Sequence, residues 1–254
     1  MKAQQRRNEL RVFGLNACLA VYARRPQAIR KVYLQPALLP RFAEVLRWCA
    51  ARRVGYRLVG GEDLRRLTGS QHHEGVCFDV LRPEPPALAD LLARLRPDQP
   101  AQIVCLDGVG NPHNLGAILR SAAHFGLLAV AVAAEAGLSL SGAACRVAEG
   151  GAEAVPLLHL RADDWPRLQA AGFVCAATVV RGGEPLYARP LPPRLLWLLG
   201  AEGSGLPSER IAATPLRIGI PGSGAVESLN VSAAAAVLFA EHARQHGIQP
   251  LPPQ

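Results

Sequence analysis

Two patterns of hydrophobic and polar residues alternate along most of the chain. Short continuous apolar runs, typical of buried β-strands, are separated by stretches in which apolar residues recur roughly every three or four positions, as on one face of a helix. In the second half, strand-like runs that are almost entirely apolar lie at residues 103–108, 127–133, 155–160, 173–180 and 195–200. Strands of this kind, with helices between them, predict a parallel sheet that is covered on both faces.

The stretches between these strands have the helical pattern. We expect helices at residues 114–125, 141–150, 163–172 and 206–213. Ser228 and Asn230 then precede an Ala-rich segment, and both residue types are favoured at the start of a helix. The chain is therefore expected to close with a long helix that begins near Asn230.

The first part of the chain shows the same alternation on a smaller scale. Helical patterns at 16–26, 40–53 and 61–69 stand between strand-like runs at 31–35, 56–60 and 75–81. Residues 82–100, which follow, carry five prolines around one short helical run. Proline-rich segments of this kind act as linkers, so the sequence predicts a small α/β domain at 8–81 and a larger α/β domain at 101–248.

Positive charge is concentrated in arginine. The formal net charge is +8, and all but two of the 28 basic residues are Arg, the exceptions being Lys2 and Lys31. Because guanidinium groups bind phosphate through paired hydrogen bonds, this composition favours a polyanionic partner such as nucleic acid. The first domain is expected to bind that partner through charge. Its candidate cluster consists of Arg11, Arg24, Arg25, Arg30 and Lys31.

Cysteine usage and hydropathy point to a cytoplasmic protein that does not enter a membrane. The six cysteines lie inside apolar segments without a Cys-x-x-Cys pair, and we expect them to be buried free thiols. No apolar run has the length and purity of a membrane span. The first residues, MKAQQRRNELRVFG, lack the apolar core of a signal peptide.

Candidate chemistry lies in three polar, glycine-containing segments that follow predicted strands. In open parallel sheets, ligands bind beyond the carboxyl ends of the strands. The three segments are DGVGNPHNLGAILRSA at 107–122, GAEGSGLP at 200–207 and IGIPGSGAVESLNVS at 218–232. We therefore expect the functional site where these three segments meet.

Two common kinds of site do not fit these segments. The glycines at 108, 110 and 116 have the wrong spacing for a dinucleotide-binding turn, and the next acidic residue, Glu135, lies too far along the chain. No lysine follows a glycine-rich turn, as a Walker motif requires. His72 and His73 are adjacent, so in a strand they would point to opposite faces, and no cysteine is near them. We expect no metal site.

Taken together, the three segments resemble the three motifs of the SpoU branch of the SPOUT RNA methyltransferases. NPHNLGAILRSAAHFG is similar to the first motif, Asn-x-Gly-x-x-x-Arg, and LLGAEGSGLP to the second, Gly-x-Glu-x-x-Gly. IPGSGAVESLNVSAAAAV is similar to the third, which ends in Ser-Leu-Asn-Val-Ser, although Gly222 stands where Met is common. The first domain also resembles the small RNA-binding domain that precedes the catalytic domain in this family.

The resemblance implies a fold and an assembly. It predicts a parallel-sheet SPOUT catalytic domain with a deep trefoil knot at its carboxyl end, one of the rare exceptions to unknotted chains. It also implies a homodimer, since in this family the sites lie near an interface built by the catalytic domain.

The same resemblance implies S-adenosylmethionine as the methyl donor and a ribose 2′-hydroxyl of structured RNA as the acceptor. Ribosomal RNA is the expected substrate and transfer RNA the alternative. Two further alternatives are a catalytically inactive RNA-binding homologue and a nucleotide-binding oxidoreductase, of which the latter is disfavoured by the glycine spacing.

The motif positions name the expected site residues. The resemblance implies that Arg120, Asn114, Glu202, Ser228 and Asn230 serve catalysis, and that Gly200, Gly205, Ile220 and Leu229 bind the cofactor. A permanently charged guanidinium is unsuited to act as a base, so Arg120 is expected to hold an RNA phosphate and stabilise the developing alkoxide. Side-chain amides both donate and accept hydrogen bonds, which suits Asn114 and Asn230 to fixing a ribose.

Overall fold

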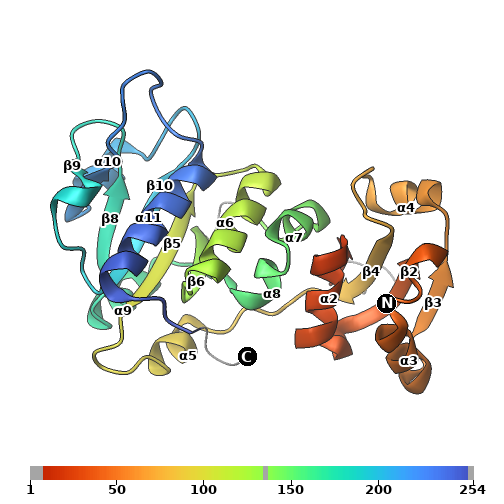
Figure 1. Cartoon of the computed structure of the whole chain (residues 1–254). Coiled ribbons are helices and arrows are strands. Elements are labelled where there is room, and N and C mark those ends of the chain that lie inside the picture. The colour runs from red at the N-terminus through yellow and green to blue at the C-terminus, as the bar shows by residue number, and fades with distance from the viewer. Residues whose placement is uncertain (1–7, 134–136, 251–254) are drawn as a thin grey trace.

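The computed structural model describes residues 8–133 and 137–250 of the 254-residue chain. It contains two β-sheets, each with its own helices, which lie side by side in an elongated molecule (Figure 1). The predicted α/β class is confirmed in both parts.

The first part is built on a four-stranded sheet in the order β1-β4-β2-β3. The pairs β1–β4 and β4–β2 are antiparallel, and β2–β3 is parallel. The strands are β1 (Glu9–Phe13), β2 (Ile29–Leu34), β3 (Gly55–Leu58) and β4 (Val76–Leu81). The helices are α2 (Leu15–Arg24), α3 (Ala43–Arg52) and α4 (Gly61–Thr68), with short 3-10 turns at Pro26–Ala28 and Pro36–Leu38. The sequence pattern did not predict β1, and His72 and His73 lie in a loop before β4, not in a strand.

The second part is a seven-stranded sheet in the order β7-β6-β5-β10-β8-β11-β9. Every pairing in it is parallel, as predicted from its apolar runs. The strands are β5 (Ala101–Asp107), β6 (Ala129–Ala133), β7 (Leu157–Leu160), β8 (Val174–Thr178), β9 (Glu184–Pro185), β10 (Arg194–Gly200) and β11 (Leu216–Gly219). A 3-10 turn at Leu186–Ala188 follows β9.

Helices cover both faces of this sheet. They are α6 (Pro112–His124), α7 (Gly142–Ala148), α8 (Gly151–Ala154), α9 (Asp164–Ala170), α10 (Ser208–Ala212) and α11 (Val231–His246), with α5 (Leu88–Ala93) inside the proline-rich segment. On one face, Trp197 and Leu199 of β10 pack in a cluster that includes Ile118 of α6 and Phe239 of α11. On the other face, the cluster around Leu198 includes residues of α5, α9 and α10. The alternation of side chains along one strand thus fills two separate layers.

The two parts of the molecule share one hydrophobic cluster. It runs from Val12 and Phe78 of the small sheet to Val104 and Leu106 of the large one. At Gly142 of α7 a Cβ atom would lie 2.4 Å from the carbonyl oxygen of Arg11, so only glycine allows this approach. The proline-rich segment therefore joins two parts that pack directly against each other.

Polar contacts at this junction use one of the arginines expected to bind nucleic acid. Arg25 at the end of α2 donates from Nε and Nη2 to both carboxylate oxygens of Glu153 in α8, the second at 2.8 Å. Its Nη1 donates to the carbonyl oxygen of Leu81. Only 13% of its side chain is exposed, so the expectation that Arg25 belongs to an open cationic cluster is wrong. Arg11 is likewise bound, to Asp79 and to the carbonyl of Leu67.

All six cysteines are free thiols, and five of them are buried, as predicted. Burial raises the pKa of the Cys77, Cys105 and Cys145 thiols to about 12, so these groups stay protonated. Among the described residues, no helix has the length and hydropathy needed to cross a membrane. Within the same residues, no cluster of three His, Cys, Asp or Glu side chains is suited to a metal ion.

Candidate active site

The three motif segments meet at the carboxyl ends of the two central strands. Gly200 at the end of β10 lies opposite Asp107 at the end of β5, so the loops after these strands are neighbours. The loop after β5 leads into α6, which begins with Pro112 and is capped by Asn111, whose Oδ1 accepts a hydrogen bond from the His113 amide at 2.8 Å. Asn230 caps α11 in the same way. Two helix starts and one loop therefore converge on one place, as the sequence predicted.

Three side chains from these segments form a hydrogen-bonded cluster. Oε1 of Glu202 accepts from Nδ2 of Asn230 at 2.6 Å and from Nδ2 of Asn114 at 3.1 Å. Nδ2 of Asn230 also donates to Oδ1 of Asn114 at 3.2 Å. Asn114 is buried, whereas Glu202 and Asn230 are exposed. One carboxylate oxygen thus holds both amides in place and leaves the exposed edge of the cluster open to a ligand.

Ser232 completes this cluster, and the sequence analysis did not single it out. Its Oγ donates to Oδ1 of Asn230 at 2.6 Å, and its backbone amide donates to the same atom at 2.9 Å. With its oxygen bound on the α11 side, the Asn230 amide presents its nitrogen to Glu202 and Asn114. A serine two residues after a helix-capping asparagine was the available signal.

A pocket of about 540 Å³ adjoins the cluster. Its lining includes Glu202 and Asn230 and also five of the other expected site residues, namely Gly200, Gly205, Ile220, Ser228 and Leu229. The walls combine backbone of the 200–205 and 218–220 segments with apolar side chains, of which Val180 and Leu229 are 60% and 47% exposed. Such a slot suits a flat ring whose edges form hydrogen bonds.

Glycine is required at the base of this pocket by the path of the chain. A Cβ atom on Gly200 would lie 2.2 Å from the carbonyl carbon of Gly205 and 2.3 Å from the amide nitrogen of Leu206. Gly205 itself has φ +67°, a left-handed conformation that favours glycine. Gly200 and Gly205 therefore bring the loop back against the end of β10, which places Glu202 at the tip.

The structure does not bring Arg120 to the cluster. It lies in α6, six residues after Asn114, so in an α-helix with about 3.6 residues per turn the two side chains leave on different sides. Arg120 is exposed and does not line the pocket, and its side chain makes no hydrogen bond or ion pair with the residues that the structure describes. It remains available to an external anion.

The sequence analysis also did not single out an ion pair at the end of β5, between Arg210 and Asp107. Nε of Arg210 in α10 lies 2.8 Å from Oδ2 of Asp107, and its guanidinium carbon lies 5.5 Å from the centre of the Trp165 ring. These contacts tie α9 and α10 to the end of β5. Asp107 is thus a structural partner of Arg210 and lies outside the pocket lining.

Comparisons with known proteins agree with this arrangement. Residues 101–240 match the model of the SpoU rRNA Methylase family, and residues 11–86 match the model described as RNA 2′-O ribose methyltransferase substrate binding. An Escherichia coli protein named "Uncharacterized tRNA/rRNA methyltransferase YfiF" is 37% identical over 249 residues, which cover 96% of this chain and 70% of that protein. The protein of Nitrosomonas europaea named "23S rRNA (guanosine-2′-O-)-methyltransferase RlmB" is 35% identical over 240 residues, covering 92% and 91%.

Solved structures show the same fold. An rRNA methyltransferase from Sinorhizobium meliloti, described as AdoMet-bound, superposes with a TM-score of 0.76 at 23% identity and covers 96% of this chain and 90% of that one. The SpoU methyltransferase AviRb from Streptomyces viridochromogenes superposes with a TM-score of 0.78, also at 23% identity, covering 97% and 93%.

Proposed function

Because the chain belongs to the SpoU rRNA methylase family, we propose that it transfers a methyl group from S-adenosylmethionine to a ribose 2′-hydroxyl of ribosomal RNA. The observation that carries this proposal is the cluster of Asn114, Glu202 and Asn230 beside a glycine-built pocket. Each member comes from a different motif, and the three meet only in the folded chain.

The pocket fits the proposed donor. Ile220 and Leu229 offer apolar contacts to an adenine ring, and the backbone of the 200–205 and 218–220 segments offers donors and acceptors to its edges. When bound, S-adenosylmethionine supplies an electrophilic methyl group on a sulfonium. Gly200, Gly205, Ile220 and Leu229 would hold the donor, and the exposed Leu229 side chain would lose its contact with water.

The polar cluster is suited to positioning the acceptor. Asn230, held by Ser232 and Glu202, keeps its amide in one orientation at the mouth of the pocket. Ser228 lines the same pocket and offers a hydroxyl. Methyl transfer depends chiefly on alignment of the attacking oxygen, so fixed polar groups of this kind accelerate it. Arg120 lies outside the pocket lining of the single chain. Its proposed role, to bind the adjacent phosphate and stabilise the alkoxide as it forms, therefore requires the RNA or a second copy of the chain to bring it to the acceptor.

A homodimer is part of this proposal. Apolar side chains of Val180, Val226 and Leu229 are exposed beside the pocket, at 60%, 70% and 47%. Exposed apolar groups that gather next to a polar site support a protein interface there. A second copy of the chain would cover them and would bring further side chains to the open edge of the cluster.

The remaining expectations fit the same function. Residues 8–81 would form the RNA-binding domain, supported by the substrate-binding model that matches 11–86, with 82–100 as its linker to the methyltransferase domain at 101–248. The carboxyl-terminal part would contain the trefoil knot that the resemblance implies. We place the enzyme in the cytoplasm, because its proposed RNA substrate is there.

Transfer RNA is the second candidate substrate, because the Escherichia coli relative is named for both RNAs. Mapping ribose methylation by mass spectrometry in ribosomal and transfer RNA, with and without the gene, separates the two. We expect one ribosomal ribose to lose its methyl group in the deletion strain and to regain it with the unaltered chain but not with Asn230→Ala. Unchanged methylation in both RNAs, or no binding of S-adenosylhomocysteine by calorimetry, would show that the proposed function is wrong.

A further inference from the structure

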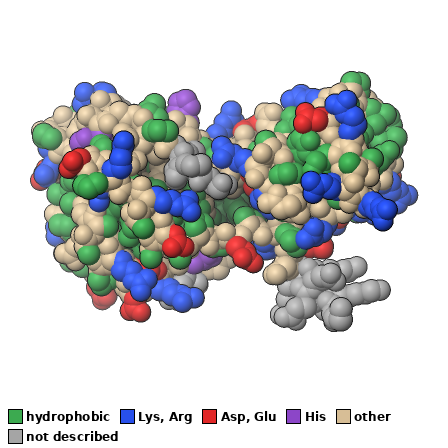
Figure 2. Space-filling model, turned by 90° about the horizontal axis from the view of Figure 1, so that it is seen from below, with side chains coloured by type: hydrophobic (Ala, Val, Ile, Leu, Met, Phe, Trp, Pro, Cys, Tyr) green, Lys and Arg blue, Asp and Glu red, His purple; other side chains and the backbone are tan. Residues whose placement is uncertain are grey.

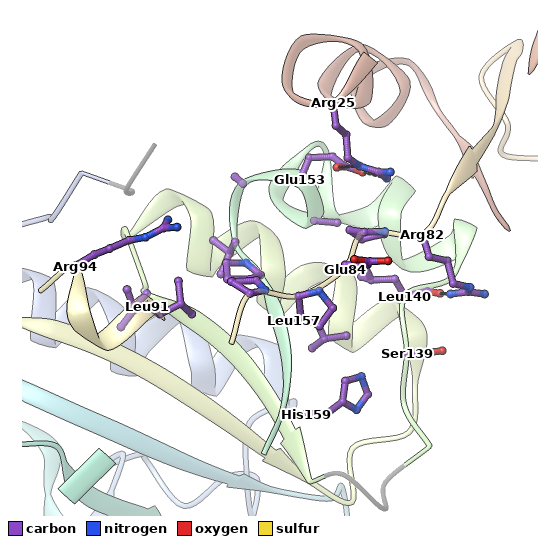
Figure 3. A pocket seen from close by; sticks show the side chains of 18 residues that line it. Arg25, Arg82, Glu84, Leu91, Arg94, Ser139, Leu140, Glu153, Leu157 and His159 are labelled. Atoms are coloured by element: carbon purple, nitrogen blue, oxygen red, sulfur yellow. Dashed lines mark hydrogen bonds and ion pairs between the residues drawn. The ribbon is translucent and has the colours of Figure 1, made fainter. Parts of the chain in front are cut away.

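A second pocket lies between the two parts of the molecule, away from the polar cluster. It has a volume of about 380 Å³. Figure 2 shows a hollow between the two lobes, with hydrophobic side chains at its base. Arg25, which follows α2, lines the pocket together with residues of the proline-rich segment, α5, α8 and the edge strand β7 (Figure 3). Neither the motifs nor the proposed cofactor site accounts for it.

The lining combines an apolar interior with polar groups at the rim. Leu91, Leu128, Leu140 and Leu157 form the walls together with the rings of Pro83, Pro85 and Pro86. Among the described residues, the exposed side chains of Ser139 and His159 have no hydrogen-bond partner. Apolar walls with a few polar groups are the usual composition of a site for a small organic ring.

The charge at the rim favours an anionic ligand. Arg25 and Glu153 neutralise each other within the wall. Arg82 and Arg94 are exposed and line the same pocket, with Glu84 as the one further acidic residue of its lining. Nη1 of Arg82 is bound to the carbonyl of Leu140 at 2.9 Å, which holds its guanidinium at the rim. The formal charge of the lining is positive, with three arginines against two glutamates, and guanidinium groups form strong paired hydrogen bonds with phosphate.

The position of the pocket links it to RNA. Arg25 and the segment Arg82–Pro86 belong to the residues that match the substrate-binding model, whereas α8 and β7 belong to the methylase match. Gly151 at the start of α8 packs against the backbone of Leu119 and Arg120 in α6. The next three residues of α8 line the pocket. The same short helix thus contacts the proposed phosphate-binding arginine and forms part of the pocket wall.

From these contacts we propose that the junction pocket binds one nucleotide of the RNA substrate other than the methylated one. Its base lies against the leucine and proline walls, and its phosphate contacts Arg82 and Arg94. Free nucleoside monophosphates share this chemistry, so the test compares them with RNA. The inference rests on the proposed function, because it requires RNA as the substrate.

The test uses the full chain, fragments of ribosomal RNA, and two substitutions in the pocket. Ser139→Trp fills the pocket from an exposed position, and Arg94→Gln removes one charge from the rim. Arg96→Gln is the matched control, because Arg96 is exposed, lies two residues from Arg94 and does not line the pocket. Fluorescence anisotropy measures RNA affinity, and calorimetry measures binding of S-adenosylhomocysteine and of free nucleoside monophosphates.

We expect Ser139→Trp to weaken RNA binding about tenfold or more, as loss of one stacked base does, with an unchanged melting temperature and unchanged S-adenosylhomocysteine affinity. Arg94→Gln should weaken RNA binding and reduce its dependence on salt, because one phosphate contact is lost. Arg96→Gln should leave both nearly unchanged. Normal RNA affinity in Ser139→Trp would overturn this inference but not the proposed function. So would a pocket that binds free nucleoside monophosphates while both substitutions leave RNA affinity unchanged. Absence of RNA binding by the unaltered chain would overturn the proposed function as well.

Discussion

The polar cluster at the strand ends and the charged contact between the two parts use similar groups to opposite effect. In the cluster, one carboxylate oxygen of Glu202 orients two amides, and the exposed edge stays open. At the junction, both oxygens of Glu153 and all three nitrogens of the Arg25 guanidinium are bound within the protein. An exposed polar network with an open edge can position a ligand, whereas a buried one in which every nitrogen and carboxylate oxygen is bound within the protein holds the fold together.

The largest expected effect concerns catalysis at the exposed polar cluster. Arg120→Ala should lower the rate of methyl transfer by roughly a hundredfold to a thousandfold, the usual cost of losing one donor to a developing oxyanion. S-adenosylhomocysteine affinity and the melting temperature should stay nearly unchanged, because Arg120 is exposed and bound to no described residue. Single-turnover kinetics and calorimetry measure these quantities.

Arg120→Lys serves as the companion variant. It should recover little of the rate, because an ammonium group cannot form the paired hydrogen bonds of a guanidinium. Near-normal turnover in Arg120→Ala with an intact melting profile would show that Arg120 is a surface residue without a role in the reaction.

Glu153→Ala tests the buried contact between Arg25 and Glu153 and should destabilise the fold by about 3 kcal/mol. Removing one partner leaves the Arg25 guanidinium buried without its counter-charge, and such losses cost about 3–5 kcal/mol. The side chains of Arg25 and Glu153 are only 13% and 5% exposed. Urea unfolding measures the change.

Glu62→Ala is the control for this prediction. Glu62 pairs with Arg65 on the surface of α4, where both side chains are about half exposed. Surface pairs of this kind contribute little, so the free energy of unfolding should hardly change. Equal losses in the two variants would contradict the distinction between the buried junction and the surface.

The helix α11 begins at the polar cluster, next to Asn230, and carries the buried His242 near its other end. A pH titration tests the contribution of His242 to the stability of the fold. Burial lowers the pKa of His242 to about 4, while its Nε2 lies 3.1 Å from the carbonyl oxygen of Pro192. The unfolded chain binds a proton near pH 6.5 that the folded chain resists down to about pH 4. Stability should therefore fall as the pH drops from 6.5 to 4, by up to roughly 3 kcal/mol.

His242→Gln should remove this part of the pH dependence, since glutamine does not titrate. Urea unfolding at several pH values, compared with the unaltered chain, provides the measurement. A variant whose stability falls over the same range as before would assign the dependence to other groups.

The smallest expected effect sharpens the comparison within the polar cluster. Ser232→Ala removes the hydroxyl that donates to Oδ1 of Asn230. It keeps the hydrogen bond from the residue 232 backbone amide to the same atom, which caps α11. We expect a several-fold lower rate of methyl transfer with a loss of stability of about 1 kcal/mol or less. Ser121→Ala, a substitution in α6 away from the cluster, should change neither. A Ser232→Ala rate equal to that of the unaltered chain would show that Glu202 and the Ser232 backbone amide fix the Asn230 side chain without the hydroxyl.

Much of this architecture could be predicted from local patterns. The runs 103–106 and 195–199 consist only of apolar residues, so their burial in a parallel sheet was predictable, and the polar segments after them had to lie at one edge. The strand β1 was missed because it has five residues, with Arg11 at its centre. The strand β9 has only two residues, which give too little pattern to predict.

The contacts between residues far apart in the sequence could not be predicted from local patterns. That β5 lies next to β10 follows from a sheet order that skips the strands between them in sequence. The pairing of Arg25 with Glu153 joins residues 128 positions apart, and nothing in the local sequence distinguishes Arg25 from the exposed arginines around it. The junction pocket depends on this same packing and could not have been predicted.

The shared hydrophobic cluster bears on the distance between the part of the chain that would bind RNA and the candidate site. Packing of Gly142 in α7 against the backbone of Arg11 in β1 brings the small sheet into direct contact with the larger part of the molecule, and one hydrophobic cluster runs through both. An RNA held by the first part would then present to the site only a nucleotide at one fixed separation. Under the proposed function, the methylated position would be selected by its distance, in the folded RNA, from the nucleotides that contact the first part, and not by the identity of its base.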